Sequence, residues 1–190
     1  MLYIHKIQSP VGRLTLSSDG ESLTGLWIEG QKHYASTLDP SLLEGSGTGA
    51  VRLKEKWEEK EGVKAGGDLP VFDHGIRWLE AYFKGQEPGE LPRLSPVGSE
   101  FRQMVWKVLL EVPRGHTTTY GKIGQEVAER TGRRSMSAQA VGGAVGHNPI
   151  SIMIPCHRVL GAEGGLIGYA AGVGVKKMLL EIEGEVGKGL

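Results

Sequence analysis

Cysteine is the scarcest reactive residue in this sequence: it occurs once in 190 residues, at Cys156. A single cysteine excludes an intramolecular disulfide, so the composition favours a reducing compartment over a cross-linked secreted scaffold. It also excludes a zinc site built from several thiolates. The six histidines are scattered without ligand spacing, so the sequence predicts no metal site.

Long apolar runs and net charge are absent as well. No segment approaches the roughly 20 apolar residues of a membrane-spanning helix, and no charged and then apolar leader precedes a cleavage site. We therefore expect a cytoplasmic protein without a membrane partner. The 22 basic side chains balance 22 acidic ones, which gives no overall indication of nucleic-acid binding. Residues 1–95 carry 11 basic and 14 acidic side chains, so positive charge is in excess over residues 96–190, a weak indication of phosphate contacts there.

The first half of the chain has the pattern of a small domain with strands and a helix. Alternating apolar residues with intervening turn formers predict an antiparallel meander over residues 1–40. The Gly-rich and then charged segment 45–67 predicts a solvated loop or an exposed helical turn without a function of its own. Apolar spacing predicts a helix over residues 70–83, and prolines predict a linker at about 85–98. We therefore expect an N-terminal domain over residues 1–95.

The second half predicts a mostly helical domain over residues 96–190. Ser99 is the expected N-cap of a helix that ends before Pro113. Two further helices are expected, over residues 121–130 and 137–146, with a polar turn between them. Two short helices joined in this way form a helix-turn-helix pattern.

The lone cysteine lies in the run PCHRV of residues 155–159. An adjacent imidazole and guanidinium favour the thiolate, which is the nucleophilic form of cysteine. The apolar flanks, residues 150–154 before the cysteine and 159–160 after it, predict a buried β-branched strand that presents Cys156 at its end. The alternative is that Cys156 is a small core residue, as most free cysteines are.

The same run resembles the active-site signature of the O6-alkylguanine-DNA alkyltransferases, which repair methylated DNA. Further motifs of that family occur in its order and with close to its spacing between residues 101 and 184: VPRG at 112–115, TYGKI at 119–123, AVGGA at 140–144, NPI at 148–150, GYA at 168–170, KKMLL at 176–180 and EG at 183–184. The first half is similar more loosely, through SPVG at 9–12 and GLW at 25–27. One short motif arises by accident, whereas an ordered series is specific.

This resemblance implies a fold and an activity. The fold would be α+β, with a ribonuclease-H-like antiparallel sheet and a helix in the first domain and a winged helix-turn-helix-like catalytic domain after it. The activity would be direct, irreversible transfer of a methyl or larger alkyl group from O6 of guanine in double-stranded DNA to Cys156. The protein would act once per molecule, as a monomer and without a cofactor.

The family's catalytic residues match five positions of this sequence. The resemblance makes Cys156 the nucleophile and His157 its base through a water, with Glu183 holding the imidazole, as in other activated nucleophiles. Asn148 would tie the turn before the cysteine, and Tyr120 would donate a hydrogen bond to the departing base. Taken alone, Glu183 would be a surface residue and Asn148 an ordinary helix-stopping Asn-Pro. The arrangement predicts a depressed pKa for the Cys156 thiol.

The resemblance also implies a base pocket and a DNA-binding helix. Val159, Tyr169 and Ala170 would line the pocket, because a base must leave the duplex to reach a buried thiol. Arg158 is expected to be structural and to brace either the two domains or the turn. The helix 137–146 would enter the minor groove. The implied DNA contacts are Tyr120, Gly121, Arg133, Arg134, Ala138, Gln139 and Gly142, with Arg114 and Lys122 as further basic residues near phosphates.

Small residues leave the helix 137–146 with little side-chain bulk on either face. They favour either tight packing against a neighbouring helix or close approach to DNA, and the resemblance favours the second. Family members commonly have an arginine at the position of Gln139, where it fills the stack left by the flipped nucleotide. Glutamine lacks the charge and the planar guanidinium, so we expect a weaker form of that role.

Two other classes of protein remain as alternatives. Alkyltransferase-like proteins bind damaged DNA without the cysteine and usually have tryptophan in its place, so Cys156 with His157 and Glu183 argues against that class. A winged-helix transcription factor would explain the helix-turn-helix pattern but not the run around Cys156, and that class favours a more basic recognition helix.

Overall fold

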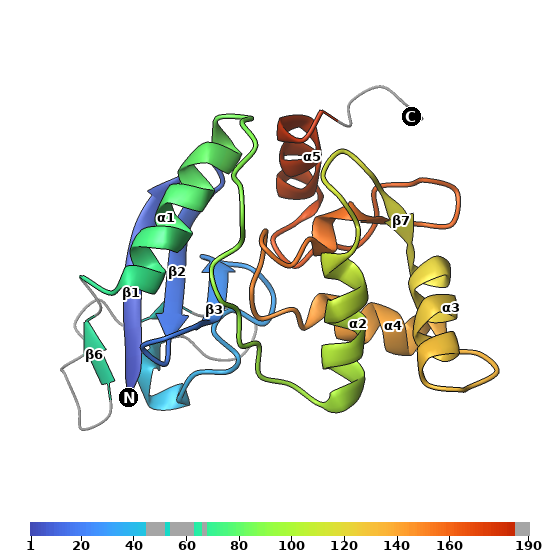
Figure 1. The fold of residues 1–190 in the computed structure, drawn as a ribbon, viewed down its shortest axis with the longest axis horizontal. Helices are drawn as coiled ribbons and strands as arrows, with labels where there is room; N and C mark the ends of the chain where they lie inside the picture. The colour runs from blue at the N-terminus through green and yellow to red at the C-terminus, as the bar shows by residue number, and fades with distance from the viewer. Residues whose placement is uncertain (45–51, 54–62, 66–67, 185–190) are drawn as a thin grey trace. The chain divides into compact units, whose positions relative to one another are not determined.

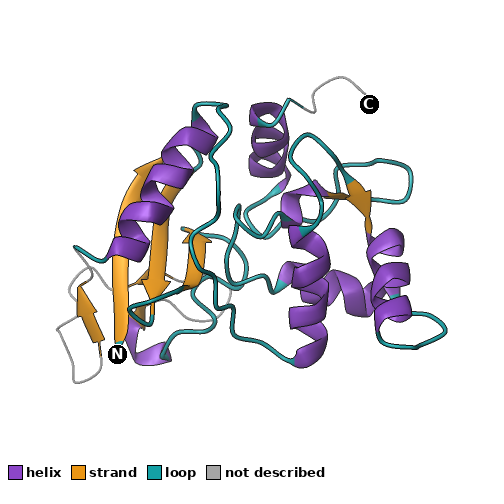
Figure 2. Ribbon diagram, in the orientation of Figure 1, coloured by secondary structure: helices purple, strands orange, loops and turns teal. Residues whose placement is uncertain are grey.

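The computed structural model describes residues 1–44, 52–53, 63–65 and 68–184. The chain forms two compact units, Met1–Val97 and Gly98–Leu190. The first unit runs from blue to green in Figure 1 and holds the long strands, whereas the second, from green to red, is mostly helical (Figure 2). The predicted α+β class is confirmed.

The first unit is built on a sheet in the order β3-β2-β1-β6. Its elements are β1 (Leu2–Ser9), β2 (Gly12–Ser18), β3 (Leu23–Ile28), η1 (Pro40–Leu42), β4 (Leu43–Glu44), β5 (Arg52–Leu53), β6 (Val63–Ala65) and α1 (Pro70–Phe83). The first three strands form the predicted antiparallel meander, and β6 pairs with β1 in parallel. The loop or helical turn predicted for residues 45–67 is wrong at β5 and β6, and the charged run 54–61 lies outside the described residues.

The meander follows from turn chemistry and burial. Between β1 and β2, the Ser9 hydroxyl donates to the Gly12 carbonyl at 2.6 Å, and Gly12 has a φ of 110°, which favours glycine. β2 lies in the middle of the sheet and is buried on both faces, with Leu14 on one and Thr15 on the other. The Thr15 and Tyr34 hydroxyls are 2.7 Å apart, so this buried polar side chain has a partner.

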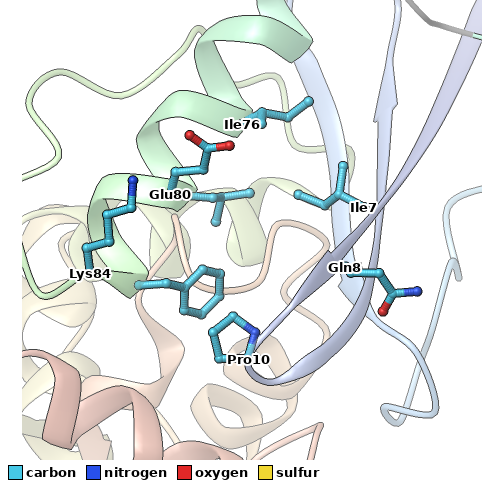
Figure 3. A pocket seen from close by; sticks show the side chains of 8 residues that line it. Ile7, Gln8, Pro10, Ile76, Glu80 and Lys84 are labelled. Carbon is cyan, nitrogen blue, oxygen red and sulfur yellow. The ribbon is translucent and has the colours of Figure 1, made fainter.

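Helix α1 packs on β2 and β3. Pro70 occupies its first turn, where the missing N–H leaves no helical hydrogen bond unmade, and Gly85 follows its end with a φ of 73°. Its buried residues are Val71, Phe72, Gly75, Trp78, Leu79 and Tyr82. Ile76 and Phe83 belong to the apolar pattern but are only half-buried. They line a pocket of about 490 Å³ together with Ile7 and Pro10, at the end of β1 (Figure 3).

The second unit packs α2, α3 and α4 against one another and contains the short parallel pair β7 and β8. Its elements are α2 (Glu100–Leu110), β7 (Thr118–Thr119), α3 (Tyr120–Arg130), α4 (Ala138–Gly146), η2 (Cys156–Arg158), β8 (Val159–Leu160) and α5 (Val173–Ile182). The helices predicted between residues 99 and 146 are present with nearly the predicted bounds. Helix α5 was not expected from the sequence pattern.

Side-chain caps start the helices of this unit. The hydroxyls of Ser99, Thr119 and Ser137 accept hydrogen bonds from backbone N–H groups in the first turns of α2, α3 and α4. Trp106 is buried in α2, and its Nε1 donates to the Ala144 carbonyl at 2.9 Å. This bond joins α2 to α4 and so fixes the helix that leads into the cysteine segment.

Candidate active site

The segment before the cysteine is a buried turn, so the strand predicted for residues 150–154 is wrong. Ile152 has a φ of 70°, which is strained for a β-branched residue, and the Ile154 N–H donates to the Ile150 carbonyl at 3.0 Å. Asn148 closes the turn from inside. Its Oδ1 accepts from the Ile150 N–H at 3.0 Å, and its Nδ2 donates to the Ile154 carbonyl at 2.8 Å. Every residue from 148 to 159 is buried, so the β-branched run reflects burial rather than a strand.

Cys156 opens the 3-10 helix η2, and its side chain is almost enclosed, with 5% exposed. Burial raises the pKa of the thiol, so the predicted depressed pKa is wrong for the resting site. Several groups oppose burial: Asn148 Nδ2 lies 3.1 Å from Sγ, the charge of Lys176 is near, and the backbone N–H groups of Cys156 and His157 donate toward the sulfur. At rest the sulfur is a protonated thiol surrounded by groups that stabilise a thiolate.

Glu183 is the centre of a buried ion-pair network. It is the C-cap residue of α5, 7% exposed, and accepts hydrogen bonds from His157 Nε2 at 2.7 Å and from Arg158 Nε and Nη2 at 2.8 and 2.9 Å. Burial alone would raise the pKa of Glu183, but these hydrogen bonds outweigh it and hold the pKa far below its usual range. The carboxylate is therefore ionised, with the bidentate Arg158 guanidinium as its counter-charge.

This carboxylate sets the state of His157. Burial lowers the pKa of His157, against the hydrogen bond and the negative charge of Glu183. A carboxylate accepts hydrogen bonds and cannot donate, so the 2.7 Å contact assigns the imidazole hydrogen to Nε2 and the lone pair to Nδ1. His157 is thus a neutral base with a fixed tautomer, fully buried next to the nucleophile in the sequence.

Arg158 connects distant segments of the second unit. In addition to Glu183, its Nη1 donates to the Val112 carbonyl at 2.6 Å, just after α2. The end of α2, the cysteine turn and the end of α5 are thereby held together. This geometry agrees with the bracing role expected of Arg158.

Tyr120 begins α3 and lies near the thiol. Burial raises the pKa of Tyr120, and the negative charge of a Cys156 thiolate adds to the shift. The Tyr120 hydroxyl donates to the Gly168 carbonyl at 3.4 Å, and a Cβ added at Gly142 would lie 3.9 Å from the Tyr120 ring. Tyr120 therefore touches both α4 and the loop before α5, while Gly121 beside it is exposed.

The residues predicted to line a base pocket also gather here. Val159 is buried directly after η2, and Ala170 is half-buried in the loop before α5. The Tyr169 ring meets the His157 ring edge to face, with centroids 6.5 Å apart and an interplanar angle of 85°. An aromatic ring, an apolar side chain and backbone thus lie beside the Cys-His pair.

Helix α4 presents mostly small side chains to solvent, and Gln139 is the longest of them. Its exposed residues are Ala138, Gln139, Ala140 and Gly143. A Cβ added at Gly143 or Gly146 would meet nothing within 4 Å, so tight packing inside the protein does not explain these two glycines.

The predicted phosphate contacts divide into two groups. Arg133 and Arg134 are exposed in the turn between α3 and α4, where they line a polar pocket of about 350 Å³ with Gly121. Arg114 is different: its Nη2 donates to the Ile182 carbonyl at 2.9 Å, at the end of α5. One nitrogen of Arg114 is therefore engaged at a helix end, and its contact with phosphate stays a prediction.

Sequence reasoning assigned no role to Lys176, which is fully buried in α5. Its Nζ donates to the carbonyls of Val159 and Ile167 at 2.5 and 2.6 Å. The signal was present in the sequence: Lys176, Leu179, Leu180 and Glu183 have the spacing of one helical face, and two of them are charged. A charged residue on an apolar helix face indicates a buried charged side chain with specific partners, which the motif match alone did not reveal.

Comparison with known proteins identifies the family. Residues 100–185 match the family described as 6-O-methylguanine DNA methyltransferase, DNA binding domain. A methylated-DNA--protein-cysteine methyltransferase of Methanosarcina acetivorans is 35% identical over 184 residues, which cover 96% of this chain and 99% of the relative. The one from Mycobacterium bovis is 38% identical over 183 residues, covering 96% and 93%. This chain belongs to the methylated-DNA--protein-cysteine methyltransferase family. The resemblance seen in the motifs is confirmed.

Solved structures agree with this family membership. The crystal structure of Mycobacterium tuberculosis OGT in complex with DNA is 35% identical and superposes with a TM-score of 0.70, covering 95% of this chain and 92% of the other. An O6-methylguanine DNA methyltransferase from Methanococcus jannaschii, at 22% identity and a TM-score of 0.59, shares the fold. No helix in the described part of the chain has the length and apolar character needed to cross a membrane.

Proposed function

We propose that this protein repairs DNA by moving a methyl or larger alkyl group from O6 of guanine to Cys156, where the group stays. The observation that carries the proposal is the buried network of Asn148, His157 and Glu183 around the single cysteine. It occurs in a chain whose relatives bear the name of this activity over nearly their whole length. An incidental core cysteine would not need such a network.

The reaction is a displacement at the alkyl carbon. The thiol proton of Cys156 passes to His157, through a water, and the Glu183 carboxylate stabilises the imidazolium. The thiolate then attacks the alkyl carbon, so that the C–S bond forms as the C–O6 bond breaks. The electron pair of the broken bond goes to guanine, which takes up one proton. The proton lost by the thiol balances the proton gained by the base, so no cofactor is required.

Double-stranded DNA containing O6-alkylguanine is the proposed partner. The small outer face of α4 allows the backbone to approach a groove, and Arg133 and Arg134 supply positive charge for phosphates. The damaged base leaves the stack and enters the pocket beside Cys156. The proposed DNA contacts are Tyr120, Gly121, Arg133, Arg134, Ala138, Gln139 and Gly142, and the proposed pocket residues are Val159, Tyr169 and Ala170.

We also propose a fold type for each of the two domains. The meander with a parallel fourth strand beside β1 supports a ribonuclease-H-like first domain, over residues 1–95 with a supporting role. The capped helices α3 and α4 with the β7-β8 pair support a winged helix-turn-helix-like catalytic domain over residues 96–190. The protein would act as a monomer in the cytoplasm.

Intact-protein mass spectrometry tests the reaction directly. The protein is incubated with a duplex containing one O6-methylguanine, and we expect the mass of one methyl group to be added and to map to Cys156. An unmodified duplex and the Cys156→Ser variant are the controls, and neither should gain mass. Cys156→Ser should still bind the duplex, because the thiol acts in chemistry and not in docking. A methyl group on another residue, or none on the wild type, would contradict the proposal.

A further inference from the structure

Lys176 is a fully buried charge that the reaction described above does not use. It lies on the inner face of α5, beside Leu179 and Leu180. An ammonium group in an apolar interior is unfavourable unless nearby groups are arranged for it. The contacts of its Nζ therefore indicate what the surroundings are arranged to do.

In the part of the chain that the structure describes, the ammonium donates its hydrogen bonds to backbone carbonyls. Nζ donates to Val159 at 2.5 Å, to Ile167 at 2.6 Å and to Gly168 at 3.4 Å. Val159 directly follows the Cys-His-Arg turn, whereas Ile167 and Gly168 lie in the loop before α5. One side chain thus fixes the two backbone segments between which the proposed base pocket lies. The Gly168 carbonyl is shared with the Tyr120 hydroxyl, so the ammonium also fixes the acceptor of Tyr120.

The ammonium is also electrostatically coupled to the nucleophile. Burial lowers the pKa of Lys176 to about 8, and a thiolate at Cys156 raises it. In return, the charge of Lys176 lowers the pKa of Cys156. Carbonyl groups solvate an ammonium but carry no net charge, so loss of the thiol proton would create the missing counter-charge.

The other charged or titratable groups around the thiol do not supply this charge. Arg158 and Glu183 form a bidentate pair in which their charges cancel. His157 is neutral at rest, and the Tyr120 phenol is protonated near neutral pH because burial raises its pKa. Among the described residues that act on the Cys156 titration, Lys176 therefore contributes the uncompensated positive charge.

We propose that Lys176 is a positioning residue for alkyl transfer, with an ammonium that holds the two backbone segments of the base pocket and supplies a buried positive charge that favours the Cys156 thiolate. The first part rests on the proposed function, because it concerns the pocket for the base. The second part does not, because it concerns only the ionisation of the sulfur. The two parts are therefore tested with different reagents.

The charge is tested with iodoacetamide, a small neutral electrophile that needs neither DNA nor a base pocket. Lys176→Met removes the charge and keeps an unbranched side chain, while Lys177→Met, at an exposed neighbouring position paired with Glu181 at 4.0 Å, is the matched control. Loss of an opposite charge shifts a pKa by one unit or more, so Lys176→Met should react about tenfold more slowly near neutral pH. Its rate should also rise at higher pH than that of the wild type. Lys177→Met should match the wild type, and an unchanged pH profile in Lys176→Met would overturn the charge pairing.

The pocket role is tested with Lys176→Arg, which keeps the charge but replaces a compact ammonium with a planar fork. We expect its iodoacetamide profile to stay close to wild type while single-turnover methyl transfer from an O6-methylguanine duplex falls by about tenfold or more. Undiminished transfer would overturn the positioning role, and this variant keeps the test decisive if Lys176→Met does not fold. A wild type that fails to accept methyl from DNA, while Lys176→Met still alters the iodoacetamide profile, would reject the proposed function and leave the charge pairing intact.

Discussion

At the scale of single residues, the buried acid and base around Cys156 make folding stability depend on pH. The pKa of His157 lies below its ordinary 6.5 in the folded protein, and that of Glu183 lies far below its ordinary 4.5. In both cases the unfolded chain binds protons more readily than the folded one. The stability from these two groups is therefore fully present above pH 6.5, and it is lost as the pH falls below 6.5 and then below 4.5.

Glu183→Gln should remove the more acidic part of this dependence. At neutral pH the variant should be less stable by about 3 kcal/mol, because Arg158 keeps a buried charge without its carboxylate. Below pH 4.5 its stability should fall less steeply than that of the wild type. Urea unfolding at a series of pH values measures both effects, with Glu181→Gln at an exposed position of the same helix as the control. An identical slope in Glu183→Gln and wild type would show that Glu183 does not carry the acid sensitivity.

Removing the amide of Asn148 should lower the free energy of unfolding substantially. Asn148→Ala removes the hydrogen bonds to the Ile150 N–H and the Ile154 carbonyl, and of these two buried groups the carbonyl still accepts from the Cys156 N–H at 2.8 Å. We expect a loss of about 2–4 kcal/mol in unfolding free energy, measured with urea at neutral pH. The thiol should also lose reactivity, because the amide no longer donates to Sγ. Gln125→Ala, at an exposed residue of α3 whose amide also donates a side-chain hydrogen bond, should change stability by less than about 0.5 kcal/mol; a similar loss in both variants would contradict this account.

At the scale of elements, α4 is the helix on which DNA recognition is proposed to depend. Gln139 is exposed near its start, at the position where the resemblance to alkyltransferases implies an arginine in other members. Gln139→Arg should tighten binding to duplex DNA, steepen its salt dependence by up to about one unit of slope, and speed repair of a duplex substrate. The added guanidinium would both meet phosphate and fill the gap in the stack. Binding isotherms at several salt concentrations and single-turnover rates measure these changes.

A free benzylated guanine separates flipping from chemistry in that experiment. It has no stack to open, so Gln139→Arg should react with it at the wild-type rate. Gln103→Arg, at an exposed position on α2, adds the same charge on another helix and should not speed duplex repair. Equal acceleration on both substrates would show that Gln139 does not occupy the stack.

The sequence predicted elements better where local rules dominate. Ser99 and Pro113 bracket α2, and the caps and glycines between residues 119 and 146 bracket α3 and α4, because capping is decided within a few residues. The turn at 150–154 was predicted as a strand, since β-branched residues favour strands unless tertiary burial overrides them. Helix α5 escaped prediction because Lys176 interrupts its apolar face, although the pattern fits once burial of that charge is known.

The sequence predicted which residues form the site but not the ionisation state of its thiol. The residues named from the family pattern lie together: Asn148 contacts Cys156, and His157 contacts Glu183. The predicted direction of the shift in the thiol pKa was wrong, because basic neighbours in the sequence do not show how far the sulfur is shielded from solvent. The charge of Arg158 is paired with that of Glu183. Burial of the sulfur raises the thiol pKa more than the remaining hydrogen-bond donors lower it. Desolvation is a property of the folded surroundings, which a sequence pattern does not contain.

At the scale of the whole molecule, the single cysteine limits the protein to one reaction. The C–S bond of the product has no second thiol in the 190 residues to attack it. With excess O6-methylguanine duplex, repaired guanine should therefore plateau at one equivalent of protein, which a time course of substrate loss measures. A second addition of protein should give a second plateau of the same height. Continued turnover after the first plateau would contradict transfer to a retained cysteine.

The Arg158 brace also bears on how the reactive centre comes into being during folding. It joins Val112 to a residue 46 positions later and, through Glu183, to another 25 positions beyond that. Contacts between such distant segments form only when most of the unit has already collapsed. A nascent chain still lacking α5, or a partly folded one, therefore carries Cys156 without Glu183, which fixes the His157 tautomer, and without the buried Lys176 ammonium. Alkyl transfer from guanine thus requires a completely folded unit. An incompletely folded chain would not use up its single cysteine in this reaction.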